Sequence, residues 1–213
     1  VALLAGFILR EATAKNPLMP LSVFRSRNVA GANLVQILMV AGLFGMFFMG
    51  ALYLQRVLGY SAIEVGVAFL PLSIGIGAMS LKWAPMLVNR YGPRLVLLPA
   101  LLLIAVALIL LSRVTVDGNY ATDILPPMLM LGIGAGLGFP ALMTLAMSGA
   151  TAADAGLASG LVNTSQQMGG ALGLALLVTL STTRTDERVA EGVSQAAAMT
   201  DGYQLAFAIV AGL

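Results

Sequence analysis

Five long apolar stretches, spread over nearly the whole chain, constrain this sequence more than any other feature. They run over residues 29–54, 62–87, 95–112, 124–147 and 156–180. Each is long enough to cross a bilayer as an α-helix, which takes roughly 20 mostly apolar residues. Hydrophobic residues make up 59% of the chain and charged residues 9%, whereas soluble domains have about 45–50% and about 25%. The sequence therefore predicts an all-α, polytopic membrane protein.

Both ends of the chain are apolar and too short to span a membrane. Residues 1–9 read VALLAGFIL and have neither a starting Met nor the basic region of a signal peptide. Residues 204–213 also stop before a span is complete. We expect one transmembrane bundle over residues 1–213 that is truncated at both ends, with partial helices at 1–9 and 204–213.

The composition argues against enzymatic chemistry. The chain has no Cys and no His, which removes disulfides, thiolate metal sites, the commonest metal ligand and the commonest general base. Glu64, Asp123 and Asp154 lie near the ends of apolar stretches rather than within them. We predict no catalytic residue, no metal and no cofactor. A net charge of +2 on scattered side chains also argues against a nucleic-acid partner, and leaves the lipid bilayer as the expected environment.

The distribution of basic residues predicts the orientation in the membrane. Alternate loops, taken as one side, hold most of the basic residues: Arg10, Lys15, Arg25, Arg27, Lys82, Arg90 and Arg94. The other side holds Arg56, Arg113, Arg184 and Arg188. Because cytoplasmic loops carry an excess of Lys and Arg, residues 10–28 and 89–94 are expected in the cytoplasm and residues 181–203 outside.

A polar run, NTSQQ at residues 163–167, interrupts the last apolar stretch. On a helix, Asn163, Gln166 and Gln167 share one face. Two interpretations remain open for them. Their amides could bind neighbouring helices, each bond being worth about 0.6–2 kcal/mol, or they could line a water-filled cavity, because polar groups within membranes tend to mark transport pathways. We favour the cavity.

The same stretch also carries small residues at every fourth position. Ser165, Gly169 and Gly173 have the spacing that lets a neighbouring backbone approach closely. We expect them to mediate helix packing.

A second stripe lies in the stretch 29–54. Asn33, Gln36, Phe44 and Phe47 share a helical face. Two amides beside an aromatic wall would suit a mostly apolar ligand with a few polar groups, so we expect this stripe to face Asn163 and Gln167 across a substrate cavity. Ordinary core or lipid contact is the alternative for Phe44 and Phe47.

Glycine and proline mark packing and bends in two other stretches. The sequence GIGAGLGFP at residues 132–140 has no strand before it and no acidic partner after it, which argues against a nucleotide-binding loop. Gly132 and Gly136 are expected at a close helix contact. Pro140 and Pro71 are expected at kinks.

Four stretches together resemble a known transporter family: NPLMPLSVFRSRN (16–28), YLQRVLGYSAIEVGVAFLP (53–71), NRYGPR (89–94) and AGLASGLVNTSQQMGGALG (155–173). They look like the EmrB/QacA-type drug:proton antiporters, the fourteen-helix branch of the major facilitator superfamily. The resemblance implies that residues 1–9 end the eighth helix, that the five long stretches are helices nine to thirteen, and that the last partial helix is the fourteenth. The chain would then be most of the C-terminal helical bundle.

The loop sequence PMLVNRYGPR resembles the second-half copy of the superfamily motif G-x-x-x-D-R-x-G-R-R. Arg90, Gly92 and Arg94 match the motif, and Asn89 replaces its Asp. The alternative is a short turn whose Arg residues only hold the membrane topology.

The resemblance implies a secondary transporter in the plasma membrane of a bacterium. It would export hydrophobic or amphipathic drugs in exchange for protons by alternating access, and so confer antibiotic resistance. The N-terminal bundle and the proton-coupling residue would lie outside this chain. Two alternatives remain open: an exporter or importer of an endogenous metabolite, and a membrane scaffold or sensor that does not transport.

Overall fold

A computed structural model describes residues 10, 27–148 and 155–212, and every element in these ranges is helical. The elements are α2 (Arg27–Arg56), α3 (Ala62–Ala68), α4 (Leu70–Ala78), the π-helix η2 (Met79–Trp83), α5 (Ala84–Tyr91), α6 (Pro93–Leu111), the π-helix η3 (Tyr120–Ile124), α7 (Leu125–Met147), α8 (Ala155–Ala190) and α9 (Gln195–Ala211). The predicted all-α class is confirmed. The expected partial helix at 1–9 lies outside the described residues.

Four of the described helical segments are long and apolar enough to cross a membrane. They are Val29–Arg56, Ala62–Tyr91, Pro93–Leu111 and Tyr120–Met147, which correspond to the first four predicted stretches. The fifth stretch forms most of α8, a helix of 36 residues. α8 is not among the four candidate spans, because its polar run and its Thr-rich, charged end lower its mean hydropathy.

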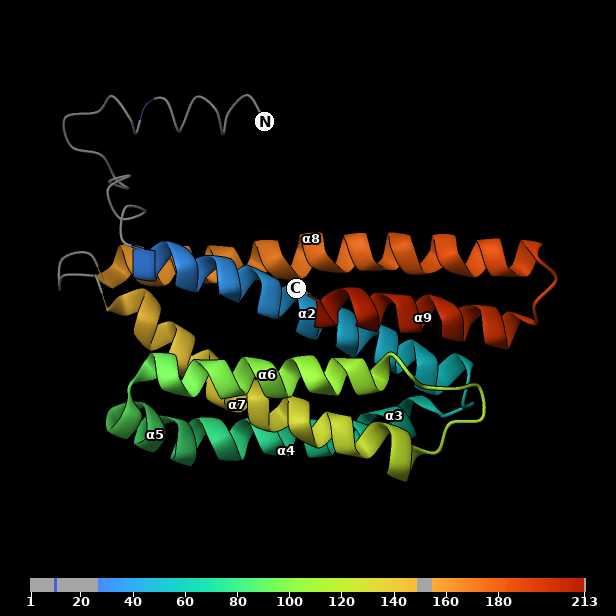
Figure 1. The fold of residues 1–213 in the computed structure, drawn as a ribbon, viewed down its shortest axis with the longest axis horizontal. Helices are drawn as coiled ribbons and strands as arrows, with labels where there is room; N and C mark the ends of the chain where they lie inside the picture. Colours follow the sequence, from blue (N-terminus) through green and yellow to red (C-terminus); the bar gives the residue numbers. More distant parts are fainter. Residues whose placement is uncertain (1–9, 11–26, 149–154, 213) are drawn as a thin grey trace.

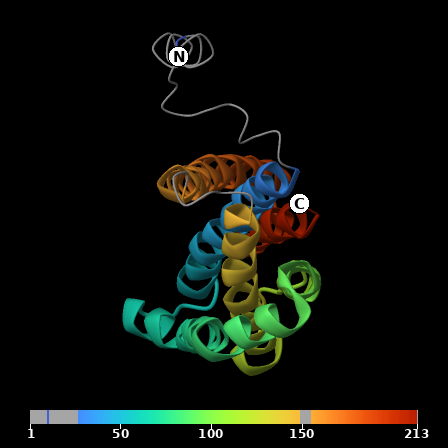
Figure 2. The same cartoon turned by 90° about the vertical axis from the view of Figure 1, so that its left-hand side faces the viewer.

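The helices run back and forth along one long axis (Figure 1). α8 and α9 lie on one side of the bundle and α4, α5 and α6 on the other, while α2 and α7 cross between them (Figures 1 and 2). The connections from α2 to α3, from α6 to η3 and from α8 to α9 all lie at one end (Figure 1). We call this the outer end, because the Lys and Arg distribution predicts that it is outside the cell.

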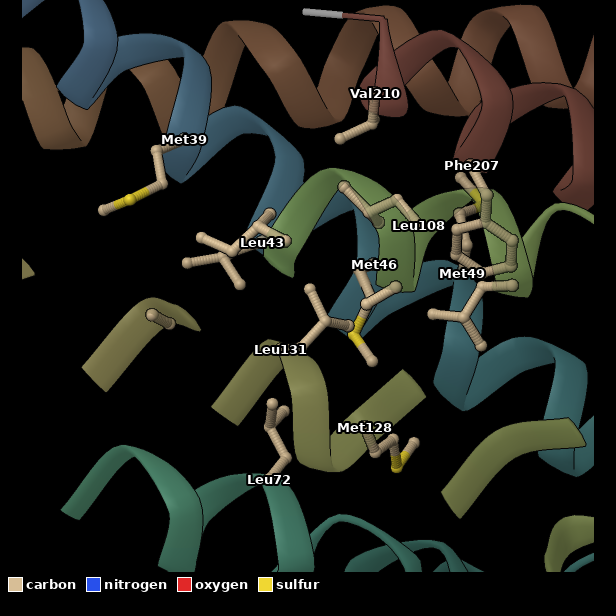
Figure 3. Packing of buried hydrophobic residues seen from close by; sticks show 14 of the residues in the cluster. Met39, Leu43, Met46, Met49, Leu72, Leu108, Met128, Leu131, Phe207 and Val210 are labelled. Carbon is tan, nitrogen blue, oxygen red and sulfur yellow. The ribbon is translucent and has the colours of Figure 1, made fainter. Parts of the chain in front are cut away.

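The core lies where α2, α6, α7 and α9 meet. Met46 and Met49 of α2, Leu108 of α6, Leu131 of α7 and Phe207 of α9 are almost fully buried there (Figure 3). Flexible methionine side chains fill irregular gaps between helices that cross at an angle. This core fixes α2, the helix that carries the predicted aromatic stripe.

Glycine backbones bring α4 and α7 into direct contact. A Cβ atom at Gly132 would lie 2.7 Å from the carbonyl oxygen of Leu72, and one at Gly136 would lie 2.8 Å from that of Ile76. The backbone of Gly75 lies against Gly132 in the same interface. Side chains at these positions would force the two helices apart.

The predicted single helix at 62–87 is divided into several elements. α3 ends at Ala68, and α4 begins at Leu70 with Pro71 in its first turn, the position that tolerates the missing N–H of proline. The hydroxyl of Tyr120 donates a hydrogen bond of 2.8 Å to the carbonyl oxygen of Ala68 at this break. The π-helix η2 then adds a second irregularity, and a Cβ at Gly136 would lie 2.7 Å from its Met79 Cβ. α7, in contrast, runs without interruption through Pro140.

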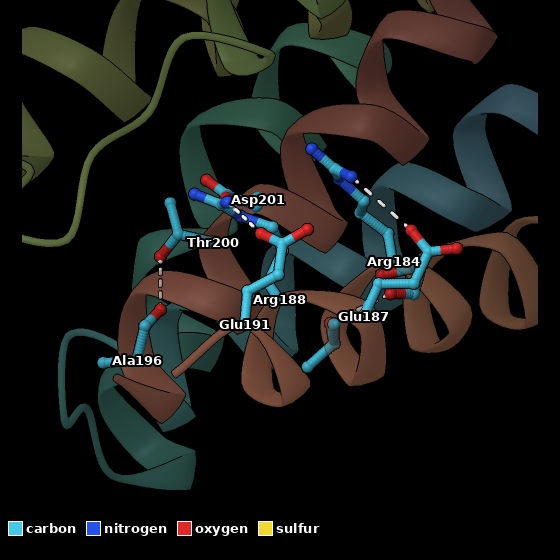
Figure 4. Close-up of polar contacts among 9 residues, drawn as sticks. Arg184, Glu187, Arg188, Glu191, Ala196, Thr200 and Asp201 are labelled. Atoms are coloured by element: carbon cyan, nitrogen blue, oxygen red, sulfur yellow. Dashed lines mark hydrogen bonds and ion pairs between the residues drawn. The ribbon is translucent and has the colours of Figure 1, made fainter. Parts of the chain in front are cut away.

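α8 continues beyond its predicted end at residue 180, and α9 begins earlier than its predicted start at 204. With 36 residues, α8 is about 54 Å long at 1.5 Å per residue, whereas the hydrocarbon core of a bilayer is about 30 Å thick. Arg188 of α8 pairs with Asp201 of α9 at 2.6 Å and with Glu191 at 2.5 Å (Figure 4). The bonds to Asp201 and Glu191 raise the pKa of the Arg188 guanidinium above its ordinary value. The pair with Asp201 joins the extended end of α8 to α9, whereas the pair with Glu191 is local to the end of α8.

Candidate functional site

α2 and α8 approach each other closely through the small residues of α8. A Cβ at Gly169 would lie 2.5 Å from the carbonyl oxygen of Ile37, and one at Gly173 would lie 2.7 Å from the Cα of Ala41. One turn before Gly169, the Ser165 Oγ donates a hydrogen bond of 2.8 Å to the Asn33 Oδ1. Ser165, Gly169 and Gly173 are therefore all placed in the contact between the two helices.

Asn33 and Gln36 do not lie on an open surface, in contrast to the expectation that they line a cavity. Asn33 is 5% exposed and Gln36 is 2% exposed. The Asn33 Nδ2 also donates to the Val29 carbonyl oxygen at 2.9 Å, so this amide is satisfied inside the protein. The physical reason is the small-residue stripe of α8, which brings that helix against α2 and encloses Asn33. Among the described residues, the Gln36 Nε2 is the buried side-chain atom without a hydrogen-bond partner.

Phe44 and Phe47, from the same predicted stripe, are exposed. Their exposed fractions are 51% and 40%. The Phe44 ring lies next to α8, because a Cβ at Gly170 would be 3.3 Å from it. Phe47 stacks on Phe69, at the break between α3 and α4, with ring centroids 5.1 Å apart and planes 15° from parallel. An aromatic surface therefore extends along α2 from α8 to the break.

The amides of the polar run lie on the same open side of α8. Asn163 and Gln167 are exposed and Gln166 is partly buried. Residues three or four apart on a helix are neighbours on its surface, so Gln167 is adjacent to Gly170, where Phe44 packs, and Asn163 lies one turn further. The Asn163 Nδ2 donates to the Ser159 carbonyl oxygen within the helix at 3.1 Å, which leaves its Oδ1 available. Four predicted residues thus share an open face of α2 and α8: Phe44, Phe47, Asn163 and Gln167.

The loop between α5 and α6 is a tight turn built on Gly92. Gly92 has a φ of 83°, a conformation that glycine adopts without strain, and its N–H donates to the Val88 carbonyl oxygen at 2.9 Å. Asn89 and Arg90 are exposed on the last turn of α5, and the Arg90 guanidinium lies over the Tyr91 ring, 5.4 Å from its centroid. Arg94 is exposed in the first turn of α6. The turn places its Arg residues on the surface at the end opposite the outer end (Figure 1).

The structure also has a cavity that the sequence did not predict. It has a volume of about 510 Å³ and lies at the outer end, between α2, α8 and α9. Its lining includes Arg56 of α2 and Asp186 of α8. Both residues stand out in the sequence as charges just beyond apolar stretches, but nothing in the sequence indicates that they share a cavity. We call this space the outer cavity.

Comparison with known proteins places the chain in a family. The profile of the Major Facilitator Superfamily matches residues 5–174. The puromycin resistance protein pur8 of Streptomyces alboniger is 39% identical over 219 residues, which cover 100% of this chain and 44% of that protein. The cephamycin export protein CmcT of Amycolatopsis lactamdurans is 35% identical, over 90% of this chain and 39% of that protein. The tetracenomycin C resistance and export protein of Streptomyces glaucescens is 34% identical, over 86% of this chain and 34% of that protein.

The chain spans less than half the length of these relatives. They are bacterial resistance and export proteins, and together with the apolar helices they confirm the predicted location in the plasma membrane. The matching family consists of transporters, so the prediction that the chain is not an enzyme is also confirmed. Because the family profile covers most of the sequence, and because a relative 39% identical aligns over its whole length, the chain belongs to the Major Facilitator Superfamily.

Proposed function

We propose that the full-length protein exports hydrophobic or amphipathic compounds in exchange for protons, and that the open face of α2 and α8 lines part of its substrate pathway. One observation carries this proposal: Phe44 and Phe47 are exposed next to the helix face that holds Asn163 and Gln167. Aromatic rings provide apolar contact area, and a few amides beside them provide hydrogen bonds, which is the make-up of a small-molecule site.

The position of this face fits transport by alternating access. In secondary transporters the substrate binds near the middle of the membrane, between two halves that rock against each other. The rings and amides lie within α2 and α8, away from the ends of both helices. The relatives are at least twice as long as this chain, and the remaining part of such a protein would supply the opposing half. We place the proton-coupling group in that part.

The test replaces Asn163 or Gln167 by Leu in the full-length protein and compares resistance to several toxic compounds at matched protein levels. We expect a changed substrate profile with normal membrane insertion, because Leu inserts favourably, at roughly −0.6 kcal/mol on the insertion scale. The control is Thr179→Leu, an exposed threonine of α8 on the side of the helix opposite Asn163. An unchanged substrate profile in the amide variants, or an equal change in the control, would show that these amides do not line the substrate pathway.

A further inference from the structure

The outer cavity is separate from the aromatic face described above. α2 and α8 stay in contact from the Asn33–Ser165 bond to the packing of Leu177 against Gly45, and diverge beyond it toward the outer end, where α9 lies between them (Figure 1). The cavity lies in this divergence. Its volume of about 510 Å³ is within the roughly 300–1,000 Å³ of sites that hold small organic molecules.

One part of the cavity wall is apolar. The lining side chains of this kind come from all three helices: Phe48, Met49, Leu52, Val178, Val189 and Met199. Phe48 is exposed at this surface. Such a wall would hold the apolar body of an amphipathic molecule.

The remaining wall carries one charge of each sign. Arg56 of α2 and Asp186 of α8 both line the cavity, as does the phenol of Tyr203 of α9. Neither Arg56 nor Asp186 is in an ion pair within the described part of the chain. The nearby charges outside the cavity lining are paired, as Arg188 is with Asp201 and Glu191 (Figure 4).

The threonine hydroxyl groups that line the cavity are available to a ligand as hydrogen-bond acceptors. Thr182 already donates to the Val178 carbonyl oxygen and Thr185 to the Ser181 carbonyl oxygen, each at 2.9 Å. Their oxygens can therefore accept bonds from a ligand ammonium group, as the carboxylate of Asp186 can. The guanidinium of Arg56 is the matching donor for an anionic group.

We propose that the outer cavity binds an amphipathic zwitterion, with the ammonium group at Asp186, the anionic group at Arg56 and the apolar body against Phe48 and Met199. This inference rests on the proposed function, because it adds a second site for exported compounds near the side of release. A zwitterion satisfies both charges of the cavity at once, whereas a cation would leave Arg56 unpaired and an anion would leave Asp186 unpaired.

The experiment measures binding to the full-length protein in lipid nanodiscs by equilibrium dialysis at pH 7. Three probes share one apolar body and differ in charge: the dipeptide Phe-Phe, its C-terminal amide and its N-acetyl derivative. Arg56 and Asp186 are exposed, and exposed ion pairs are weak. We therefore expect Phe-Phe, the zwitterion, to bind about two- to fivefold more tightly than the cationic amide and the anionic acetyl derivative. Asp186→Asn should make Phe-Phe bind no more tightly than the anionic derivative. Arg56→Gln should make Phe-Phe bind no more tightly than the cationic amide.

Two further variants separate a ligand site from general damage. Glu187→Gln changes an exposed acid next to Asp186 that does not line the cavity, and it should leave all three affinities unchanged. Arg56→Lys keeps the charge and should keep the preference for Phe-Phe. Equal binding of the three probes would overturn the proposal, as would charge variants that behave like Glu187→Gln. If those results accompany intact drug export, this inference fails and the proposed function stands. An unchanged substrate profile in the Asn163 and Gln167 variants would instead count against the proposed function.

Discussion

Ser165 of α8 donates a buried hydrogen bond of 2.8 Å to Asn33 of α2, across 132 residues of sequence. The bond ties together the two helices whose open side carries Phe44, Gln167 and the other residues of the proposed pathway. It also turns Asn33 from a candidate ligand contact into a packing residue.

The Asn33–Ser165 bond should contribute modestly to stability. Ser165→Ala keeps a small residue in the interface and removes the donor, so we expect a loss of about 0.6–2 kcal/mol in the free energy of unfolding. The measurement is denaturant-induced unfolding of the full-length protein in mixed micelles. Thr164→Ala, at the neighbouring exposed position, is the control. Equal stability of Ser165→Ala and the native protein would show that the bond contributes nothing.

The α2–α8 contact should not tolerate larger side chains. A leucine side chain at Gly169 would clash with the backbone of Ile37, and one at Gly173 would clash with that of Ala41. We therefore expect Gly169→Leu and Gly173→Leu to lower the yield of folded protein several-fold. Fluorescence-detected size-exclusion chromatography of the full-length protein measures this. Gly160→Leu is the matched control, since nothing lies within 4 Å of a Cβ at that position of the same helix. A normal yield for Gly169→Leu would contradict the packing described here.

Tyr120→Phe should loosen the break between α3 and α4. The substitution keeps the ring but removes the hydrogen bond to the Ala68 carbonyl oxygen, at a cost of about 0.5–1.5 kcal/mol. Hydrogen exchange should become faster at the amides around Phe69. Tyr91→Phe, at an exposed ring, serves as the comparison. Unchanged exchange would mean that the break holds without this bond.

The predicted membrane orientation can be read by cysteine labelling, because the chain itself has no cysteine. A Cys at Ser194, between α8 and α9, should react with an impermeant maleimide in intact cells. A Cys at Asn89, in the turn before Gly92, should react only after permeabilisation. The opposite labelling pattern would show that the membrane orientation is the reverse of the one predicted here.

This chain alone should not transport. Alternating access needs two halves that move against each other, and the chain spans less than half the length of its relatives. Liposomes that contain only residues 1–213 should show no more drug flux than empty liposomes, while the full-length protein should show flux. Flux through residues 1–213 alone would contradict the need for a second half.

Much of the fold follows from the sequence alone, because a bilayer requires each spanning segment to satisfy its own backbone hydrogen bonds as a helix. Hydropathy therefore indicated the first four stretches, which correspond to the four helical segments long and apolar enough to cross a membrane, whereas it ended the fifth stretch at residue 180 although α8 continues to Ala190. Local chemistry explains particular positions: Pro71 lies in the first turn of α4, where a missing N–H is tolerated, and Gly92 adopts a positive φ at the turn before α6. The family could also be inferred from sequence, since its motifs are short and linear.

The tertiary structure decided which helix faces are buried. Asn33, Gln36, Phe44 and Phe47 share a stripe in the sequence, yet α8 covers Asn33 and leaves Phe44 exposed. Periodicity tells which residues share a face, but burial depends on where a second helix crosses, and that depends on side chains far away in the sequence. The outer cavity has the same origin: α2 and α8 must diverge before Arg56 and Asp186 can line one space. The Arg188–Asp201 pair at the extended end of α8 likewise forms only once α9 packs beside it.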